Sequence, residues 1–271
     1  MIGPVPPART RQLEALLLED VSPQMLTLGL LQAEGPSHFQ ACIQDDAVVG
    51  IFYLGQDGVA VTAAVKSRAA AMEIGEALRR RELRRLLGTQ LAVAGVMAGL
   101  ERNGVPKVEL RLHQVTPDDM GPYVNPSLRK ATGADLPDLL QSLEMAAAEE
   151  QEQGLSITPE LTGAEMDRLR EQITRGRIWL VDIPDQPGEI AFRVEVEAES
   201  RHGAHLGGIY THPDARGRGL ASLCMGQLAR HMLARMPRLS AFVPTSNPAA
   251  QRVVRKVGFG PGVTWTQVEL G

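Results

Sequence analysis

The sequence contains little cysteine. Its two cysteines, Cys42 and Cys224, lie far apart in apolar stretches. This arrangement is typical of buried free thiols in a reducing compartment and argues against a disulfide framework. No cysteine and histidine residues have the spacing of metal ligands, and no Gly-x-Ser-x-Gly elbow of a serine hydrolase occurs. We therefore expect no metal cofactor.

Long apolar runs and an excess of positive charge are also missing. No apolar stretch reaches membrane-spanning length, and residues 1–7 have neither the basic start nor the apolar core of a signal peptide. The net charge is −4, and both halves are slightly acidic, with 12 basic and 14 acidic residues in 1–125 and 16 and 18 in 126–271. This balance argues against a general nucleic-acid binder. We expect a cytoplasmic protein with no nucleic-acid and no membrane partner, and a homodimer is an open alternative.

The 271 residues suffice for two domains, and the sequence offers one clear boundary between them. Residues 116–127 contain Pro117, Pro122 and Pro126 together with Gly121, so this stretch cannot be a central strand or a helix interior. We therefore predict an N-terminal domain over residues 1–124 and a C-terminal domain over residues 125–271.

Patterns of apolar and turn residues predict an α/β fold with a mixed sheet in three layers. In the first domain we expect a helix, strands, helices and a strand, with one helical segment over Ala69–Arg85. In the second we expect the order β-α-α-β-β-β-α-β-α-β, with Asp135 as the N-cap of its first helix. Glu195, Glu197 and Glu199 alternate with apolar residues, which predicts a strand with one solvated face.

A glycine-rich loop follows the predicted strand His205–Thr211 and precedes a helix. Its sequence is Arg216-Gly217-Arg218-Gly219-Leu220-Ala221. The first turn of a helix has unpaired N–H groups and a partial positive charge, and glycines let an anion approach the backbone closely. Arg216 and Arg218 add guanidinium groups that can bond phosphate oxygens. The loop lacks the lysine of a P-loop and the third glycine of the dinucleotide fingerprint, so it is a phosphate-binding loop of another kind.

The pattern Arg-x-x-Gly-x-Ala after such a strand resembles the pyrophosphate loop of the GNAT superfamily of acyl-CoA N-acyltransferases. The stretch from Thr245-Ser246-Asn247-Pro248 to Val257-Gly258-Phe259 is similar to the segment that follows in this family, and the order of elements from residue 128 onward also fits. Weaker similarities extend to bacterial two-domain members. Residues 1–120 contain no comparable loop, which implies a smaller or degenerate GNAT-like N-terminal domain that does not bind CoA in the usual way.

The resemblance implies direct attack of an amine on the thioester of acetyl-CoA, the cosubstrate. It also implies that the strand His205–Thr211 diverges from the next strand, that the backbone at Ile209 and Thr211 pairs with the pantetheine arm, and that an N–H near Ile209 or Tyr210 polarises the acetyl carbonyl. The residues expected to bind the cofactor are Ile209, Tyr210, Thr211, Arg216, Gly217, Arg218, Gly219, Leu220, Ala221 and Asn247.

A general base is expected, because an alkyl ammonium has a pKa of about 10 and only the neutral amine attacks. The candidates are His205, Glu195 and Glu197, although a packing histidine and a solvated strand face are the simpler interpretations. Val254 stands where many family members have the tyrosine that protonates the thiolate, and Tyr210 is a candidate substitute. Loss of one such group typically costs about 10²–10⁴ in rate.

These observations leave three functions open. The first is an N-acetyltransferase whose acceptor is an amine-bearing small molecule or protein. The second is an acyl-CoA sensor or pseudoenzyme with little turnover. The third is an acyltransferase for a longer chain.

Overall fold

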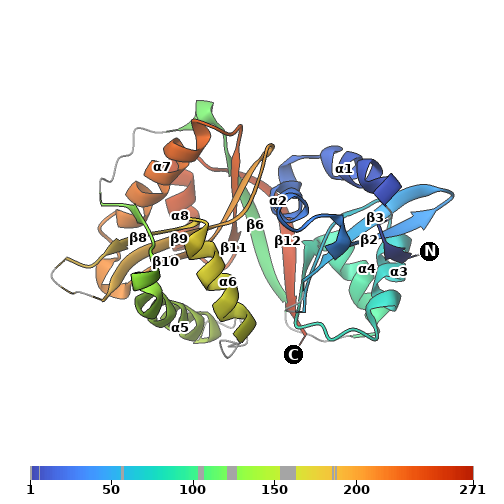
Figure 1. Ribbon diagram of the computed structural model, residues 1–271, viewed down its shortest axis with the longest axis horizontal. Coiled ribbons are helices and arrows are strands. Elements are labelled where there is room, and N and C mark those ends of the chain that lie inside the picture. Colours follow the sequence, from blue (N-terminus) through green and yellow to red (C-terminus); the bar gives the residue numbers. More distant parts are fainter. Residues whose placement is uncertain are drawn as a thin grey trace.

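The computed structural model describes residues 2–5, 7–55, 58–102, 107–120, 127–152, 163–184, 186 and 188–270. Within them, twelve strands form one mixed sheet, and helices cover both of its faces (Figure 1). The strands are β1 (Ile2–Pro4), β2 (Phe39–Gln44), β3 (Ala47–Leu54), β4 (Val59–Val65), β5 (Arg85–Thr89), β6 (Lys107–Val115), β7 (Arg129–Lys130), β8 (Ile178–Asp182), β9 (Ile190–Ser200), β10 (Gly203–Thr211), β11 (Leu239–Pro244) and β12 (Gly260–Glu269). The α-helices are α1 (Thr10–Leu18), α2 (Met25–Glu34), α3 (Arg68–Leu78), α4 (Gln90–Leu100), α5 (Leu136–Glu152), α6 (Gly163–Thr174), α7 (Leu220–Leu233) and α8 (Pro248–Val257).

The two halves of the chain repeat one order of elements. From α1 to β6, and again from α5 to β12, the order is α-α-β-β-β-α-β-α-β. The sheet order β1-β2-β3-β4-β5-β12-β6-β11-β10-β9-β8-β7 is symmetrical about the central pair, and each half has one parallel pairing, β4 with β5 and β10 with β11. The predicted mixed α/β sheet is confirmed. The repeat is far clearer in the structure than in the sequence.

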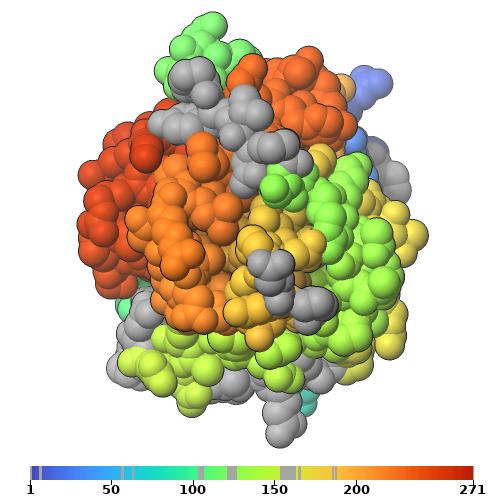
Figure 2. Space-filling model, turned by 90° about the vertical axis from the view of Figure 1, so that its left-hand side faces the viewer, coloured from blue at the N-terminus to red at the C-terminus, as the bar shows by residue number. Residues whose placement is uncertain are grey.

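The last strand of each half lies in the other half's part of the sheet. β6 pairs with β11, from Leu110 opposite Pro244 to Val115 opposite Leu239. β12 pairs with β5 over Trp265–Glu269, and β6 and β12 also pair with each other. The halves are therefore joined by an exchange of strands. In Figure 2, which views the C-terminal half end on, almost none of the blue N-terminal half is visible, so the halves lie one behind the other.

Four apolar clusters lie between the sheet and its helices. α3, α4, α7 and α8 cover one face, and α1, α2, α5 and α6 cover the other. α2 of the first half also packs on β9 of the second, because Gly29 has no side chain: an added Cβ would stand 2.5 Å from the Cβ of Ala198. The helix α2 of the first half thus covers β9 of the second half, and we call it the α2 wall.

Some local predictions are wrong for identifiable reasons. The segment Ala69–Arg85 is helical only as far as Leu78, and Arg85 already begins β5. Asp135 is the third residue of a 3-10 turn rather than an N-cap; its carboxylate accepts bonds from the N–H and hydroxyl of Thr132 and pairs with Arg129. The predicted boundary at 124/125 lies outside the described residues and stays a prediction. In the part of the chain that the structure describes, no helix combines the length and apolar character needed to cross a membrane.

Candidate active site

Strands β10 and β11 separate part-way along their length. They pair in parallel only over Ala204–Leu206 and Leu239–Ala241, although β10 continues to Thr211 and β11 to Pro244. The backbone of β10 beyond Leu206 therefore leaves the ladder with β11, and we call this gap in the pairing of the two strands the opening. This is the divergence that the sequence resemblance implied.

The glycine-rich loop connects the end of β10 to α7. Gly217 and Gly219 have φ angles of +75° and +80°, which residues with a side chain rarely adopt. Apart from the neighbours along the chain, no heavy atom of the described residues lies within 4 Å of the position that a Cβ would take at either glycine. The N–H of Leu223 donates to the carbonyl of Gly219, so the N–H groups before it in α7 have no partner within the helix. Open space above the positive end of a helix suits a diphosphate.

The two arginines of the loop differ in their contacts. Nη2 of Arg216 donates to both carboxylate oxygens of Glu149 on α5, at 2.8 and 2.7 Å, and its Nε donates to the carbonyl of Thr211 at 2.9 Å. The Arg216 guanidinium also lies 5.6 Å from the ring centre of Tyr210. Arg218 is exposed and forms no ion pair with any residue that the structure describes. In this state Arg218 is available to a phosphate, whereas Arg216 ties the loop to α5 and occupies the Thr211 carbonyl that was expected to serve the pantetheine arm.

Two glycines interrupt the pairing of β10 with β9. Gly207 pairs with Glu195 and Tyr210 pairs with Arg193, so β10 has one more residue than β9 between these two pairs. This extra residue is a β-bulge. Gly208 has a φ of +55°, and it is exposed, so ligands can reach the bulged backbone. A Cβ at Gly207 would stand 1.9 Å from Oε1 of Glu197, so glycine makes room for that carboxylate against the strand. A Gly-Gly pair inside a predicted strand is a signal for a bulge that our strand prediction did not use.

The three candidate bases lie on β9 and β10 but differ in environment. Glu195 is 6% exposed and accepts bonds from Nη1 and Nη2 of Arg168 at 2.5 and 3.3 Å. His205 is 1% exposed, its Nδ1 lies 2.8 Å from Oγ of Ser240, and burial lowers its pKa to about 3. The side chain of Glu197 is 37% exposed, with Oε2 3.9 Å from Nε2 of the neutral His205. Burial, followed by the nearby Glu195, raises the pKa of Glu197 to about 7.

These environments correct one sequence prediction. The alternation along β9 predicted a solvated face, but Glu195 is buried and the pairing of β9 with β10 is irregular around Glu197. This shift in the pairing register interrupts the alternation of side chains between the two faces of the sheet. It places the Glu197 carboxylate beside Gly207. Of the three candidates, Glu197 combines solvent access with a pKa suited to accepting a proton near neutral pH.

A sequence model of the acetyltransferase (GNAT) domain matches residues 127–260. The segment 127–260 belongs to the GNAT acetyltransferase family. No curated protein sequence matches the chain. This identification covers the half of the chain that carries the opening, the loop and the bulge.

Solved structures with the same fold extend over the whole chain. A GNAT-family acetyltransferase from Colwellia psychrerythraea has 14% sequence identity and a TM-score of 0.56, with 100% of each chain covered. A GCN5-related N-acetyltransferase from Sphaerobacter thermophilus has 13% identity and a TM-score of 0.63, covering 100% of this chain and 95% of that one. A tandem GNAT protein from the clavulanic acid biosynthesis pathway has 17% identity and a TM-score of 0.55, covering 96% and 95%. At these identities the similarity shows the fold alone.

The position of the usual GNAT tyrosine is part of the core in this chain. Val254 on α8 is 2% exposed and packs in the apolar cluster beneath α7 and α8. The hydroxyl of Tyr210, the proposed substitute, donates to Oε1 of Glu149 at 3.1 Å. Burial and the neighbouring Glu149 raise the pKa of Tyr210 to about 12. Asn247, expected to bind the cofactor, caps α8 by accepting the N–H of Ala250 at 2.9 Å.

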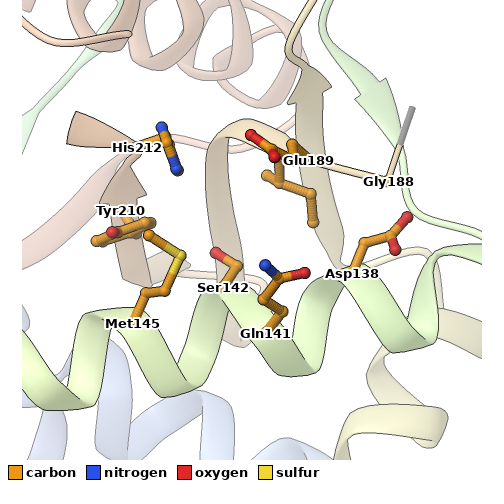
Figure 3. A pocket seen from close by; sticks show the side chains of 9 residues that line it. Asp138, Gln141, Ser142, Met145, Gly188, Glu189, Tyr210 and His212 are labelled. Atoms are coloured by element: carbon orange, nitrogen blue, oxygen red, sulfur yellow. The ribbon is translucent and has the colours of Figure 1, made fainter. Parts of the chain in front are cut away.

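A small hollow beside Tyr210 marks the packing of α5 on the strands (Figure 3). Its volume is about 10 Å³, which is room for about one water molecule. Ser142 and Met145 point from α5 toward the strands, and Tyr210 and His212 come from the end of β10 and the residues after it. The hollow is too small for an acceptor, but Ser142 within it bonds Arg193, a residue that the sequence did not suggest.

In the N-terminal half, the residues that the structure describes do not repeat the features of the C-terminal site. Ser67 caps α3 with its own side chain, which accepts the N–H of Ala70, and no glycine-rich loop precedes this helix. α3 and α4 meet backbone to backbone: an added Cβ at Gly75 would stand 2.1 Å from the carbonyl oxygen of Val96. This contact leaves no room for a cofactor between the two helices. It supports the interpretation of the first half as a degenerate copy, which stays a prediction. Across the described residues no group of three or more histidine, cysteine, aspartate or glutamate side chains has an arrangement that could hold a metal.

Proposed function

We propose that the protein transfers an acetyl group from acetyl-CoA to an amine-bearing acceptor by direct attack of the amine on the thioester. One observation carries the proposal. The carboxylate of Glu197 lies against Gly207, at the bulge of the strand that borders the opening between β10 and β11. A proton acceptor and the exposed backbone of Gly208 are thereby adjacent.

The residues present fit acetyl-CoA. Its diphosphate would bind the N–H groups at the start of α7, with Arg218 as the free guanidinium, because both glycines of the loop leave open space there. Its pantetheine arm would follow β10 through the opening. Glu197 lies directly against Gly207. We expect this carboxylate to limit the space beyond the thioester, which would favour acetyl over a longer chain.

The acceptor would enter on the face covered by α2, α5 and α6, where the side chains of Glu195 and Glu197 lie. A negative cleft favours a cationic amine. Glu197 takes a proton from the amine, the nitrogen bonds to the carbonyl carbon, and the carbon–sulfur bond breaks. The N–H of Ile209 at the bulge would stabilise the negative charge on the carbonyl oxygen. Because α2 packs on β9, both halves of the chain would form the cleft.

The thiolate product needs a proton, and Tyr210 is poorly suited to supply it. A thiol has a pKa of about 8.5, whereas the pKa of Tyr210 is raised to about 12, so this transfer would be unfavourable. Formation of the amide releases a second proton from the attacking nitrogen. We propose that water relays this proton to the thiolate and that Tyr210 instead supports the pair formed by Arg216 and Glu149.

Two measurements test the proposal. The first is thiol release from acetyl-CoA across a panel of amines, which is expected only when an amine is present. CoA binding without release on any amine would instead support the sensor, and a faster reaction with long-chain thioesters would support the third alternative.

The second measurement is CoA affinity by calorimetry. Arg218→Ala should weaken binding about 10- to 100-fold, because a hydrogen bond between charged groups contributes about 1.5–3 kcal/mol. Arg235→Ala, an exposed arginine just beyond the other end of α7, is the matched control and should leave the affinity unchanged. Equal affinities in the two variants would refute the assignment of the loop.

A further inference from the structure

A buried arginine lies beneath the bulge of β10. Arg193 on β9 is only 6% exposed and lies opposite Tyr210 in the strand register. Its Nη1 donates to the carbonyl of Gly208 at 2.7 Å, its Nε donates to Oγ of Ser142 at 3.0 Å, and its guanidinium lies 5.6 Å from the Tyr210 ring centre. Burying a guanidinium is costly, so its position here, bonded to one backbone carbonyl and one serine hydroxyl, needs an explanation.

The bonds of Arg193 fix the orientation of one peptide unit. In a trans peptide, the carbonyl of one residue and the N–H of the next point in opposite directions. The Gly208 carbonyl is held toward Arg193, so the N–H of Ile209 is turned away from it. Gly208 adopts a φ of +55°, and a Cβ there would stand 3.1 Å from Nη1 of Arg193. The glycine and the arginine therefore support the same arrangement.

We infer that Arg193 is a positioning residue, which holds the Gly208–Ile209 peptide so that the Ile209 N–H can bond the carbonyl oxygen of the acyl thioester. The inference rests on the proposed function. Arg193 does not itself touch the reacting atoms. Ser142 on α5 fixes the arginine in turn, and so links the helix of the acceptor side to the bulge.

The test uses the full chain with acetyl-CoA labelled at the acetyl carbonyl. The infrared stretch of that carbonyl falls when an N–H donates to it. In the wild type we expect the stretch below its value in water, and in Arg193→Gln we expect most of that difference lost. The same variant should lower kcat about 100-fold, the usual effect of losing one such donor, with the Kd of CoA within about twofold. A role in folding alone would not separate kcat from CoA binding in this way.

Further variants keep the test decisive. Ser142→Ala should give a smaller loss of the same kind, whereas its exposed neighbour Gln141→Ala should behave as wild type. Arg193→Lys should recover part of the stretch and rate. If Arg193→Gln does not fold, Gly208→Ala disturbs the same peptide from the other side and should abolish the shift.

Each outcome decides between the two ideas. An unchanged stretch in Arg193→Gln, or in Gly208→Ala when the former does not fold, would overturn the role of Arg193. A wild type that binds acetyl-CoA with a lowered stretch but acetylates no amine would refute the transferase and leave the positioning role standing. A wild type that does not bind acetyl-CoA would refute both the transferase function and the positioning role of Arg193.

Discussion

Replacing Glu197 by glutamine gives the sharpest test of the proposed base, because the pKa of this carboxyl is raised to about 7. At pH 6 about one molecule in eleven would carry the carboxylate, and at pH 8 about ten in eleven. The ratio of wild-type kcat to Glu197→Gln kcat should therefore rise about tenfold between these pH values. The ratio removes the titration of the acceptor amine, which affects both enzymes equally. At pH 8 the variant should be about 10²–10⁴-fold slower than wild type.

The neighbouring carboxylate provides the matched control for this profile. Glu195 raises the pKa of Glu197 through charge repulsion and is itself paired with Arg168. Glu195→Gln should move the rise in kcat to lower pH, because the charge repulsion between Glu195 and Glu197 is gone. A kcat ratio near one at pH 8 would refute Glu197 as the base. A large ratio that stays constant from pH 6 to 8 would refute its raised pKa, since an ordinary glutamate is fully ionised throughout that range.

Stability offers a check that needs no substrate. The pKa of Glu197 is higher in the folded chain than its ordinary value of 4.5, so folding favours the protonated form. This contribution is fully present below pH 4.5 and is lost as the pH rises through 7. Glutamine does not titrate, so the Tm of Glu197→Gln minus the Tm of the wild type should increase between pH 4.5 and pH 8. Solvent screening at this partly exposed side chain keeps the expected gain small.

Three further predictions concern space and sheet pairing. Gly207→Val should lower kcat at least tenfold and leave CoA affinity unchanged in calorimetry, because its Cβ would displace the Glu197 carboxylate. Val254→Tyr should not restore a proton donor; it should overpack the core by about 1–3 kcal/mol and lower the Tm in a thermal scan. A fragment of residues 125–271 should show no cooperative unfolding by circular dichroism, since both sheet neighbours of β12 belong to the first half. An unaffected kcat in Gly207→Val or faster thiol release by Val254→Tyr would contradict the first two expectations. A sharp unfolding transition of the fragment would contradict the third.

The sequence was most informative where function depends on backbone conformation set by local residues. Arg216 to Ala221 follow a strand and begin a helix, and glycines at 217 and 219 are needed for their positive φ angles. The predicted order of strands and helices in the C-terminal half also matches the structure, because turn residues mark their ends. The helix α2 was not predicted, because its run from Met25 to Leu31 is apolar on nearly all sides and shows no helical period.

The roles of charged side chains could not be read from the sequence, because they depend on tertiary contacts. Glu195 and Glu197 look alike along the strand, yet one is paired with Arg168 and the other faces a neutral His205. Arg216 and Arg218 look alike in the loop. Of the two, Arg216 is the one that pairs with Glu149, which lies 67 residues earlier in the chain. Arg193 gave no signal at all, since an arginine in a strand is usually exposed.

The exchange of strands gives a physical reason why the C-terminal half needs the first half, which we predict has no cofactor site. β6 supplies the partner of β11, the strand that forms one side of the opening, and it buries Leu112 and Val115 within the shared sheet. β12 follows the loop and α8 in the chain, and it pairs with β5 on one side and β6 on the other. Loss of the first half would therefore remove the support of β11 and the α2 wall beside β9 together. On this reasoning the N-terminal half acts as the structural complement of the site, and its own closed helix pair is no obstacle to activity.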